Sequence, residues 1–391
     1  MVNKSILMGI LLVACKNDDF EEHQISYSVN EHNILVNNTI MEIRGIVYVP
    51  SYPGILPWEI ENSTNLPSNL KKSIKDDIAQ IKQMGANTIR FWGAPEYCYQ
   101  AVKEVQDLHI LQTLWIDGEQ VDFLDSIFVE NTKNYFRDVI DRIYSVFENE
   151  QAPVCAYIIG NELSELSITN TNQNHPNVTA FSGNFIITDS TVSATEVFIA
   201  QLGDYVKSYV YENYGTVPLV TYSNDIRTFD KIDTPFLDFR SHNAYSYAVD
   251  YYLMNPTPGS TSGTLFQGWI EQVKNIYPNI PLLITETELS VSPNATHVGP
   301  PNYGYGGNTE VEQGEGIIQN LLDIESAQYP IAGVIIHEYK DSWWKFGYED
   351  SFEHDPDDIE EWFGIVKIIS DNDWYSTIDR PIVGQLKTFW Q

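Results

Sequence analysis

The sequence predicts an α/β fold: a single (β/α)8 barrel of the TIM type, with a short N-terminal β-hairpin and long loops after strands four and seven. Eight short apolar runs, each ending in polar or aromatic residues, divide the chain, and amphipathic segments with helical spacing separate several of them. Repeated strand–helix units imply a parallel sheet, and eight of them imply closure into a barrel. No long or biased linker splits the 391 residues, so one domain, residues 25–391, is favoured.

Residues 1–14 are predicted to be a lipoprotein signal peptide. The apolar run at residues 6–14 follows Lys4 and is too short for a permanent membrane span. Residues 12–15, Leu-Val-Ala-Cys, resemble a bacterial lipobox, in which Cys15 becomes the lipidated first residue. The acidic tether that follows, residues 15–24, resembles surface-export signals of some Gram-negative lipoproteins. We therefore expect a lipid anchor at Cys15 and an outer-membrane or cell-surface location in a Gram-negative bacterium, with a secreted or periplasmic protein as the alternative.

The barrel strands are predicted from their apolar runs and the turn residues that bound them. Residues 25–29 and 33–41 alternate around turn residues at Asn30 and Asn37-Asn38, which predicts the N-terminal hairpin. The eight barrel strands are then expected at residues 43–49, 87–92, 110–116, 154–159, 218–222, 237–242, 281–285 and 333–336.

The predicted helices lie between these strands. Residues 69–84 place Ile74, Ile78 and Ile81 at helical spacing, and Gly85 marks the end of that helix. The other expected helices contain apolar positions from Phe136 to Phe147 or span residues 194–214, 265–276 and 381–390. Two long insertions follow strands four and seven, at residues 163–192, with a strand-like stretch at 184–188, and at residues 291–314. Insertions after strands lie on the rim where such barrels build their active sites.

Two predicted strands end in glutamates. Strand four closes on Asn161 and Glu162, and strand seven closes on Glu286. These strand ends face each other across a barrel mouth, which permits the carboxyl separation of about 5–5.5 Å used to cleave a glycosidic bond with retention. A single strand-end glutamate is more often a salt-bridge partner or a solvated residue. Glu288, two residues further on, is a rival nucleophile because it would point the same way if the strand persisted.

The ordered set of strand-end residues resembles clan GH-A, the retaining (β/α)8-barrel glycoside hydrolases, over roughly residues 40–391. The resemblance implies that Glu162 is the acid/base and Glu286 the nucleophile. It rests on the Asn-Glu pair that ends strand four, the strand-seven glutamate, an arginine at the end of strand two, His and Tyr positions on strand six, and a tryptophan after strand eight. The positions that match are Asn161, Glu162, Glu286, Arg90, His242, Tyr245, and Trp343 or Trp344.

The candidate substrate-binding residues have expected roles and simpler alternatives. The Asn161 amide can bond the sugar 2-hydroxyl, and Arg90 and Tyr245 can both donate to the nucleophilic carboxylate. Arg90 could instead be a structural arginine. Tryptophans near strand ends either stack on sugar faces or pack in loops. The full predicted set is Arg90, Trp92, Asn161, His242, Asn243, Tyr245, Trp343 and Trp344.

The composition limits the partners. A formal net charge of −32 argues against nucleic acid and anionic membrane surfaces, and favours a neutral oligo- or polysaccharide substrate. The chain has no phosphate loop, nucleophile elbow or His-Glu-x-x-His motif, so no cofactor is expected. The acidic run at residues 354–358 could hold calcium, but a solvated loop is favoured and no metal site is predicted. Cys98 and Cys155 could pair, although buried free thiols are favoured.

The N-terminal hairpin, the Arg-Gly-Ile-Val-Tyr stretch near strand one and the Asp-Ser-Trp-Trp-Lys stretch after strand eight resemble β-1,3-glucan hydrolases, glucanosyltransferases and the barrel domain of glycoside hydrolase family two. This resemblance implies endo-acting hydrolysis of a neutral β-glucan, such as a β-1,3-glucan. Since a barrel does not fix its substrate, exo-acting β-galactosidase or β-mannosidase chemistry and glucanosyl transfer remain alternatives. A non-catalytic, glycan-binding surface lipoprotein is the alternative from a different class, and the presence of both glutamates argues against it. The sequence predicts no oligomeric state.

Overall fold

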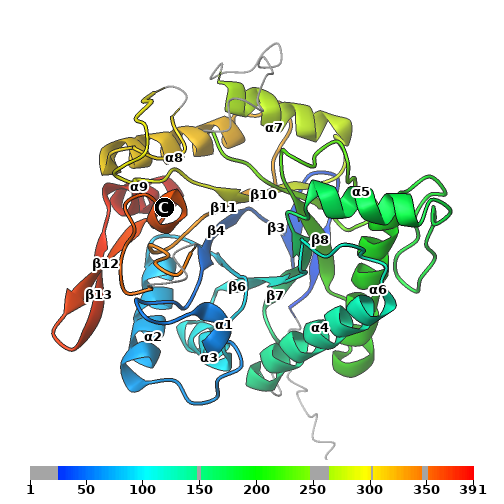
Figure 1. The fold of residues 1–391 in the computed structure, drawn as a ribbon, viewed down its shortest axis with the longest axis horizontal. Coiled ribbons are helices and arrows are strands. Elements are labelled where there is room, and N and C mark those ends of the chain that lie inside the picture. The colour runs from blue at the N-terminus through cyan, green and yellow to red at the C-terminus, as the bar shows by residue number, and fades with distance from the viewer. Residues whose placement is uncertain (1–24, 148–150, 247–263, 301–302, 346–350) are drawn as a thin grey trace, which may run out of the picture.

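The computed structural model contains the predicted closed barrel of eight parallel strands (Figure 1). The predicted signal peptide, the predicted acidic tether and Cys15 lie outside the described residues. Among the helices that are described, none has the length and apolar character needed to cross a membrane. The structure describes residues 25–147, 151–246, 264–300, 303–345 and 351–391.

The barrel strands follow one another around the ring in chain order, and the last pairs with the first. Every neighbouring pair is parallel. Nearly every strand residue is buried, as expected when the interior is filled by side chains and the outer face is covered by helices. The strands are β4 (Ile43–Tyr48), β5 (Thr88–Phe91), β6 (His109–Leu114), β7 (Val154–Asn161), β8 (Leu219–Asn224), β9 (Arg240–Asn243), β10 (Leu282–Thr287) and β11 (Gly333–Ile336).

Helices surround the barrel, but one of the eight units lacks its helix (Figure 1). Residues 225–239, all of them described, join β8 to β9 through turns without a helix. Two short helices, α1 (Pro57–Ile60) and α5 (Glu165–Asn174), lie at the rim formed by the carboxyl ends of the strands. The main helices are α2 (Ser68–Gln83), α3 (Glu96–Val105), α4 (Ser126–Phe147), α6 (Ala194–Tyr214), α7 (Leu265–Ile276), α8 (Glu310–Glu325) and α9 (Pro381–Trp390).

The N-terminal segment forms three antiparallel strands where the sequence predicted a two-stranded hairpin: β1 (Tyr27–Val29), β2 (Ile34–Val36) and β3 (Thr39–Met41). Asn37 and Asn38 both adopt positive φ, 50° and 62°. Two consecutive residues of this kind make a tight hairpin turn, which splits the second predicted strand in two. The sheet buries apolar side chains against the residues that fill the barrel interior. It therefore closes the barrel at the amino ends of the barrel strands.

The two predicted insertions contain more regular structure than expected. The first holds α5, and its strand-like stretch at residues 184–188 contributes only an isolated bridge between Ser182 and Ile187. The second ends earlier than predicted because Thr309 caps α8 with a reciprocal side-chain bond to Glu312.

A C-terminal hairpin, β12 (Val366–Asp371) and β13 (Trp374–Asp379), was not predicted. Its sequence signal is an Asn-Asp turn between two runs rich in β-branched and aromatic residues, with Asn372 at a φ of 52°. A parallel bridge between Lys340 and Val366 connects the hairpin to the segment that follows β11. The hairpin therefore extends the wall of the rim beside the eighth strand.

The two cysteines of the described chain are unpaired and buried. Burial raises the pKa of the Cys155 thiol to about 12, and burial also raises the pKa of Cys98. Of the two alternatives that the sequence left open, the structure contains free thiols rather than a disulfide.

Candidate active site

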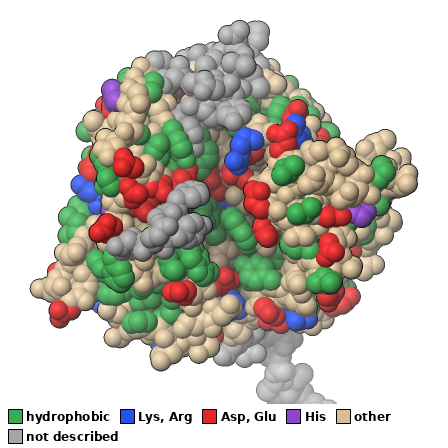
Figure 2. Space-filling model, in the orientation of Figure 1, with side chains coloured by type: hydrophobic (Ala, Val, Ile, Leu, Met, Phe, Trp, Pro, Cys, Tyr) green, Lys and Arg blue, Asp and Glu red, His purple; other side chains and the backbone are tan. Residues whose placement is uncertain are grey.

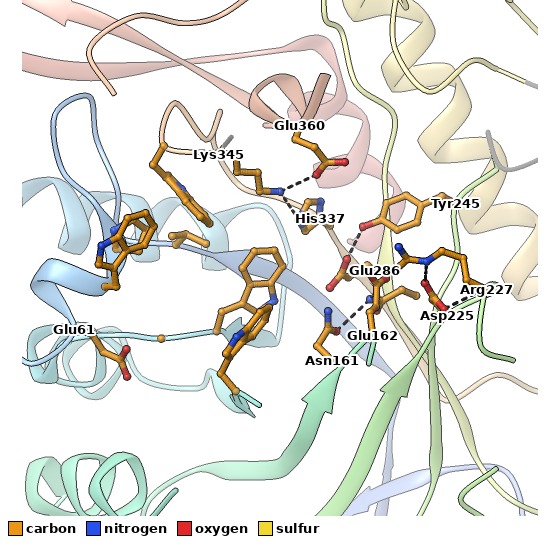
Figure 3. Close-up of a pocket in the computed structure, with 18 of the residues that line it drawn as sticks. Glu61, Asn161, Glu162, Asp225, Arg227, Tyr245, Glu286, His337, Lys345 and Glu360 are labelled. Carbon is orange, nitrogen blue, oxygen red and sulfur yellow. Dashed lines mark hydrogen bonds and ion pairs between the residues drawn. The ribbon is translucent and has the colours of Figure 1, made fainter. Parts of the chain in front are cut away.

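A cavity of about 1000 Å³ opens at the carboxyl ends of the barrel strands. Figure 2 shows hydrophobic and acidic side chains gathered around the hollow in this face. The cavity is lined by both glutamates of the predicted pair, Glu162 and Glu286, together with Asn161, Asn243 and Tyr245 (Figure 3). The structure thus brings together residues that lie on β7, β9 and β10 or directly after them.

Glu286, on β10, is held by two donors. The guanidinium of Arg90, on β5, lies 2.9 Å from Oε1 of Glu286, and the Tyr245 hydroxyl donates to Oε2 at 2.5 Å. Arg90 is completely buried and also donates to the carbonyl of Thr285 and to Asn161. Its position behind the carboxylate makes it a positioning residue for Glu286. Each oxygen of the Glu286 carboxylate therefore accepts a hydrogen bond, one from Arg90 and the other from Tyr245.

The backbone at the end of β7 turns sharply to present Glu162. Gly160 has a φ of 79°, and a Cβ there would lie 2.9 Å from the Ile116 side chain. Glu162 itself has a φ of 48°, and the pairing of β7 with β8 shifts register between Ile158 and Asn161. Glycine is favoured at position 160 because it tolerates both the left-handed conformation and the close contact. This turn directs the side chains of both Asn161 and Glu162 to the cavity.

Glu162 has two hydrogen-bond donors as neighbours, and charges of both signs act on it. The Asn243 amide donates to Oε1 at 2.7 Å, and the Arg227 guanidinium lies 2.7 Å from Oε2. Burial, followed by the negative charges of Glu286 and Asp225, raises the pKa of Glu162 to about 8, while Arg227 and the Asn243 hydrogen bond oppose this rise. A quarter of the Glu162 side chain remains exposed, so the carboxyl can reach a bound ligand.

The two asparagines connect the two carboxyl groups. Oδ1 of Asn161 accepts from Arg90 at 2.8 Å and from Asn243 at 3.2 Å. Oδ1 of Asn243 accepts from the hydroxyls of Ser223 and Thr285, which leaves its amide nitrogen directed to Asn161 and Glu162. The contacts of Arg90 fix the orientation of the Asn161 amide, so its nitrogen is available to a ligand.

Two predicted residues lie away from the cavity. His242 packs its ring against Phe229 and Trp269, at centroid distances of 6.3 and 5.7 Å, because it alternates with Asn243 along β9 and so faces the helix layer. Burial lowers the pKa of His242 well below its usual range. Trp343 stacks on His354 at 4.9 Å and packs against the core. Trp92 and Trp344 do line the cavity.

The rival carboxylate, Glu288, is fully buried and does not line the cavity. Strand β10 ends at Thr287, so the strand alternation does not extend to Glu288 and does not carry it to the same side as Glu286. Burial raises the pKa of Glu288 well above its usual range. Of the two glutamates, Glu286 is the one that faces the cavity.

Several cavity residues were missed from the sequence. Asp225 and Arg227 follow β8, and the Arg227 guanidinium contacts the carboxyl groups of both Asp225 and Glu162. His337, Lys345 and Glu360 come from the segment that follows β11. The only sequence signal for these residues was that charged residues follow the predicted strands. That signal does not predict which of the charged side chains point into the cavity.

Among the described residues, no group of three or more His, Cys, Asp or Glu side chains is arranged to hold a metal ion. This includes the acidic run at residues 354–358, where Asp358 caps the 3-10 turn Ile359–Trp362.

Comparison with known proteins shows a shared fold. No family model and no curated protein matches the sequence. Solved structures do match, at low identity. A β-glucuronidase from Ruminococcus gnavus, in complex with C6-substituted uronic isofagomine, has a TM-score of 0.60 and 14% identity over 94% of this chain and 52% of its own. A putative β-galactosidase from Bacteroides fragilis has a TM-score of 0.58 and 14% identity over 94% and 45%.

A third similar structure is ScGas2 in complex with compound 6, with a TM-score of 0.53 and 18% identity over 93% of this chain and 68% of its own. The chain spans about half the length of the first two structures. At these identities the similarity establishes the barrel fold, which this chain shares with all three.

Proposed function

We propose that the chain is a retaining β-glycoside hydrolase of clan GH-A, with Glu162 as acid/base and Glu286 as nucleophile. The observation that carries the proposal is the contrast between two carboxyl groups at one cavity. A pKa of about 8 keeps Glu162 protonated at neutral pH, as an acid catalyst requires. Arg90 and Tyr245 instead donate to the two oxygens of Glu286, which orients that carboxylate for attack. Different environments for two carboxyl groups are what an acid and a nucleophile need.

The proposed reaction has two steps. Glu162 gives its proton to the glycosidic oxygen while Glu286 attacks the sugar carbon, so the leaving group departs as an alcohol and a glycosyl-enzyme ester forms. Glu162, now a carboxylate, then takes a proton from water, which attacks the same carbon and releases Glu286. In both steps the Asn161 amide is placed to bond the sugar 2-hydroxyl, an interaction that strengthens in the oxocarbenium-like transition state.

The substrate proposed is a neutral β-glucan, such as a β-1,3-glucan, cleaved in an endo fashion. Five aromatic side chains line the same cavity as the two glutamates: Trp58, Trp92, Trp115, Phe128 and Tyr135. Trp58 and Trp115 keep 48% and 44% of their surface exposed, so indole faces are open to stack on sugar rings. A cavity of about 1000 Å³ and a strongly acidic protein together favour a neutral chain over a single charged sugar.

Exo-acting β-galactosidase or β-mannosidase chemistry is the second candidate, and the similarity to the putative β-galactosidase favours it. Glucanosyl transfer would use the same two residues, with a sugar hydroxyl in place of water. Reducing-sugar release from a panel of β-glucans, mannans and xylans separates these possibilities. Internal cleavage of β-1,3-glucan is the expected result, and release of single sugars only would favour the exo-acting candidate.

The proposed division of labour is tested with two variants and a control. Glu286→Ala should abolish turnover, and added azide should restore a product of inverted anomeric configuration because it fills the cavity and attacks. Glu162→Ala should retain turnover on substrates with good leaving groups, which need no acid. The control, Glu288→Gln, alters a carboxyl of the same segment that does not line the cavity. Near wild-type activity in Glu286→Ala, with loss in Glu288→Gln, would reverse the assignment.

A further inference from the structure

An ion pair that the proposed reaction does not use lies in the same cavity. Lys345, after β11, places Nζ 3.2 Å from Oε2 of Glu360 and 3.3 Å from Nε2 of His337 (Figure 3). All three residues line the cavity together with Glu286. The Lys345 ammonium also lies 3.9 Å from Glu338. This pair comes from a segment of the chain far in sequence from both proposed catalytic residues.

The pair is partly enclosed by apolar groups. Only 8% of the Lys345 side chain and 27% of the Glu360 side chain are exposed. The Lys345 ammonium lies over the rings of Trp92 and Phe363, at 5.3 and 5.8 Å from their centroids. A charged lysine held in such surroundings is stabilised by its anionic partner, and it is fixed in place rather than free to move in solvent.

Glu360 is close enough to Glu286 to sense its charge. Burial, followed by the negative charge of Glu286, raises the pKa of Glu360 to about 7, and Arg227 opposes this rise. Burial and the positive charges of Lys345 and Arg90 lower the pKa of His337 well below its usual range. A neutral imidazole can accept from the Lys345 ammonium. The pair therefore borders the space in front of the proposed nucleophile, where the sugar ring would lie.

The chemistry of the pair fits hydroxyl groups. The Lys345 ammonium has three donor hydrogens. His337 and Glu360 accept two hydrogen bonds from it. A carboxylate only accepts, and Lys345 engages one of the two oxygens of Glu360. A sugar hydroxyl both donates and accepts, so one hydroxyl or a neighbouring pair can bond both partners. A carboxylate at C6 would instead meet Glu360, Glu286 and a lysine that is already neutralised.

We propose that Lys345 and Glu360 form a specificity-determining pair that binds the hydroxyl groups of a neutral glycone and disfavours a uronic acid. The inference rests on the proposed function, because it places the glycone in front of Glu286. It predicts that this chain differs in preference from the similar structures that are β-glucuronidases. Removing the negative charge of Glu360 should leave the Lys345 ammonium available to a carboxylate.

The test measures binding by titration calorimetry with two probes, isofagomine and its C6-carboxylate analogue, at a pH above the Glu360 pKa of about 7, so that Glu360 is a carboxylate. Wild-type protein should bind isofagomine at least tenfold more tightly than the carboxylate probe, a difference of about 1.4 kcal/mol. Glu360→Gln should weaken the binding of isofagomine about tenfold and reverse or remove the preference. Lys345→Met should weaken both probes. Glu310→Gln is the control, because Glu310 pairs with Lys367 at the surface and does not line the cavity. It should bind both probes like wild type.

Three results would overturn the inference: tighter wild-type binding of the carboxylate probe, equal weakening of both probes in Glu360→Gln, or no binding of either probe to the wild type. Circular dichroism of each variant separates loss of fold from loss of binding. Turnover of 4-nitrophenyl β-glycosides is measured alongside. Normal dependence on Glu286 with the wrong probe preference would reject the pair and keep the hydrolase proposal. Neutral preference without turnover would reject the hydrolase proposal and keep the pair as a glycan-binding feature.

Discussion

The protonation of Glu162 is balanced by two neighbouring side chains of opposite charge. Asp225 raises the pKa of Glu162, and Arg227 lowers it. Arg227 pairs with both carboxyl groups at once, with Nη2 toward Glu162 and Nε toward Asp225. Both residues follow β8 in the one unit that lacks a helix, so an irregular connection supplies the electrostatic tuning of the proposed acid.

We predict that this balance sets the alkaline limit of activity. A proton donor works only when protonated, so kcat/KM should fall as the pH rises through about 8, the pKa of Glu162. Arg227→Met removes a charge that lowers this pKa, so the alkaline limb should move to higher pH. Asp225→Asn removes a charge that raises it, so the limb should move to lower pH. Profiles of kcat/KM against pH for the three proteins check this. Shifts in the reverse directions would exclude Glu162 as the acid.

At the scale of elements, the segment after β11 separates two adjacent tryptophans. Trp344 lines the cavity and lies 6.0 Å from Trp58, edge to face. Trp343 points to the other side and stacks on His354. One indole therefore belongs to the wall of the proposed sugar site, and its neighbour packs beneath the rim.

These positions give a matched pair of variants. Trp344→Ala should lower kcat/KM on an oligosaccharide at least tenfold, about 1.4 kcal/mol of transition-state stabilisation, because a stacking face is lost. Trp343→Ala should change kcat/KM little and lower the urea midpoint of unfolding, because it removes packing. Kinetics and unfolding curves of both variants provide the check. Full activity in folded Trp344→Ala would move the search for the sugar platform to Trp92 and Trp115.

A buried polar cluster connects α2 to the rim segment after β11. Asp77, on α2, accepts from the hydroxyls of Tyr48 and Tyr52 at 2.9 and 2.8 Å and from Lys340 at 3.1 Å. The Lys340 ammonium lies 4.1 Å from the centroid of the Tyr48 ring. Burial lowers the pKa of Lys340, and the charge of Asp77 opposes this. The cluster fixes the start of the segment that carries Trp344 and Lys345.

Loss of Asp77 should be strongly destabilising. Asp77→Ala leaves a buried ammonium and two hydroxyls without their shared acceptor, a change expected to cost about 3–5 kcal/mol. Its neighbour Asp76 pairs with Lys72 on the exposed face of the same helix. Asp76→Ala should therefore leave the unfolding midpoint nearly unchanged. Urea unfolding of the two variants makes the comparison, and equal midpoints would show that the cluster contributes little.

At the scale of the whole molecule, charge and location act together. The chain carries a net charge of −32, which repels polyanions and leaves stacking and hydrogen bonds as the means of binding a sugar chain. We propose that the protein is a surface lipoprotein, anchored through Cys15, because residues 12–15 resemble a lipobox.

The anchor is testable in cells. Cys15→Ala should move the protein from the membrane fraction to the soluble fraction, because lipidation is the proposed attachment. Fractionation and mass spectrometry of the N-terminal peptide measure both effects. A variant that stays with membranes, together with a wild-type protein that carries no acyl group, would contradict the lipoprotein proposal.

The sequence alone determined the barrel and the residues at its strand ends. Apolar runs and amphipathic helices are local patterns, and a parallel barrel brings every strand end to one rim. Asn161, Glu162, Glu286, Arg90 and Tyr245 could be identified because each lies on a strand or directly after it. Their contacts then follow from the closure of the ring.

Only the tertiary structure decided which neighbours turn inward. Strand β10 ends at Thr287, between Glu286 and Glu288, and the alternation of β9 turns His242 toward the helices. Arg227, Lys345 and Glu360 reach the cavity from irregular segments, whose backbone has no period from which a side-chain direction could be predicted. Packing between segments distant in the sequence fixes those directions, so the charged partner of the proposed acid and the proposed specificity pair became visible only in the folded chain.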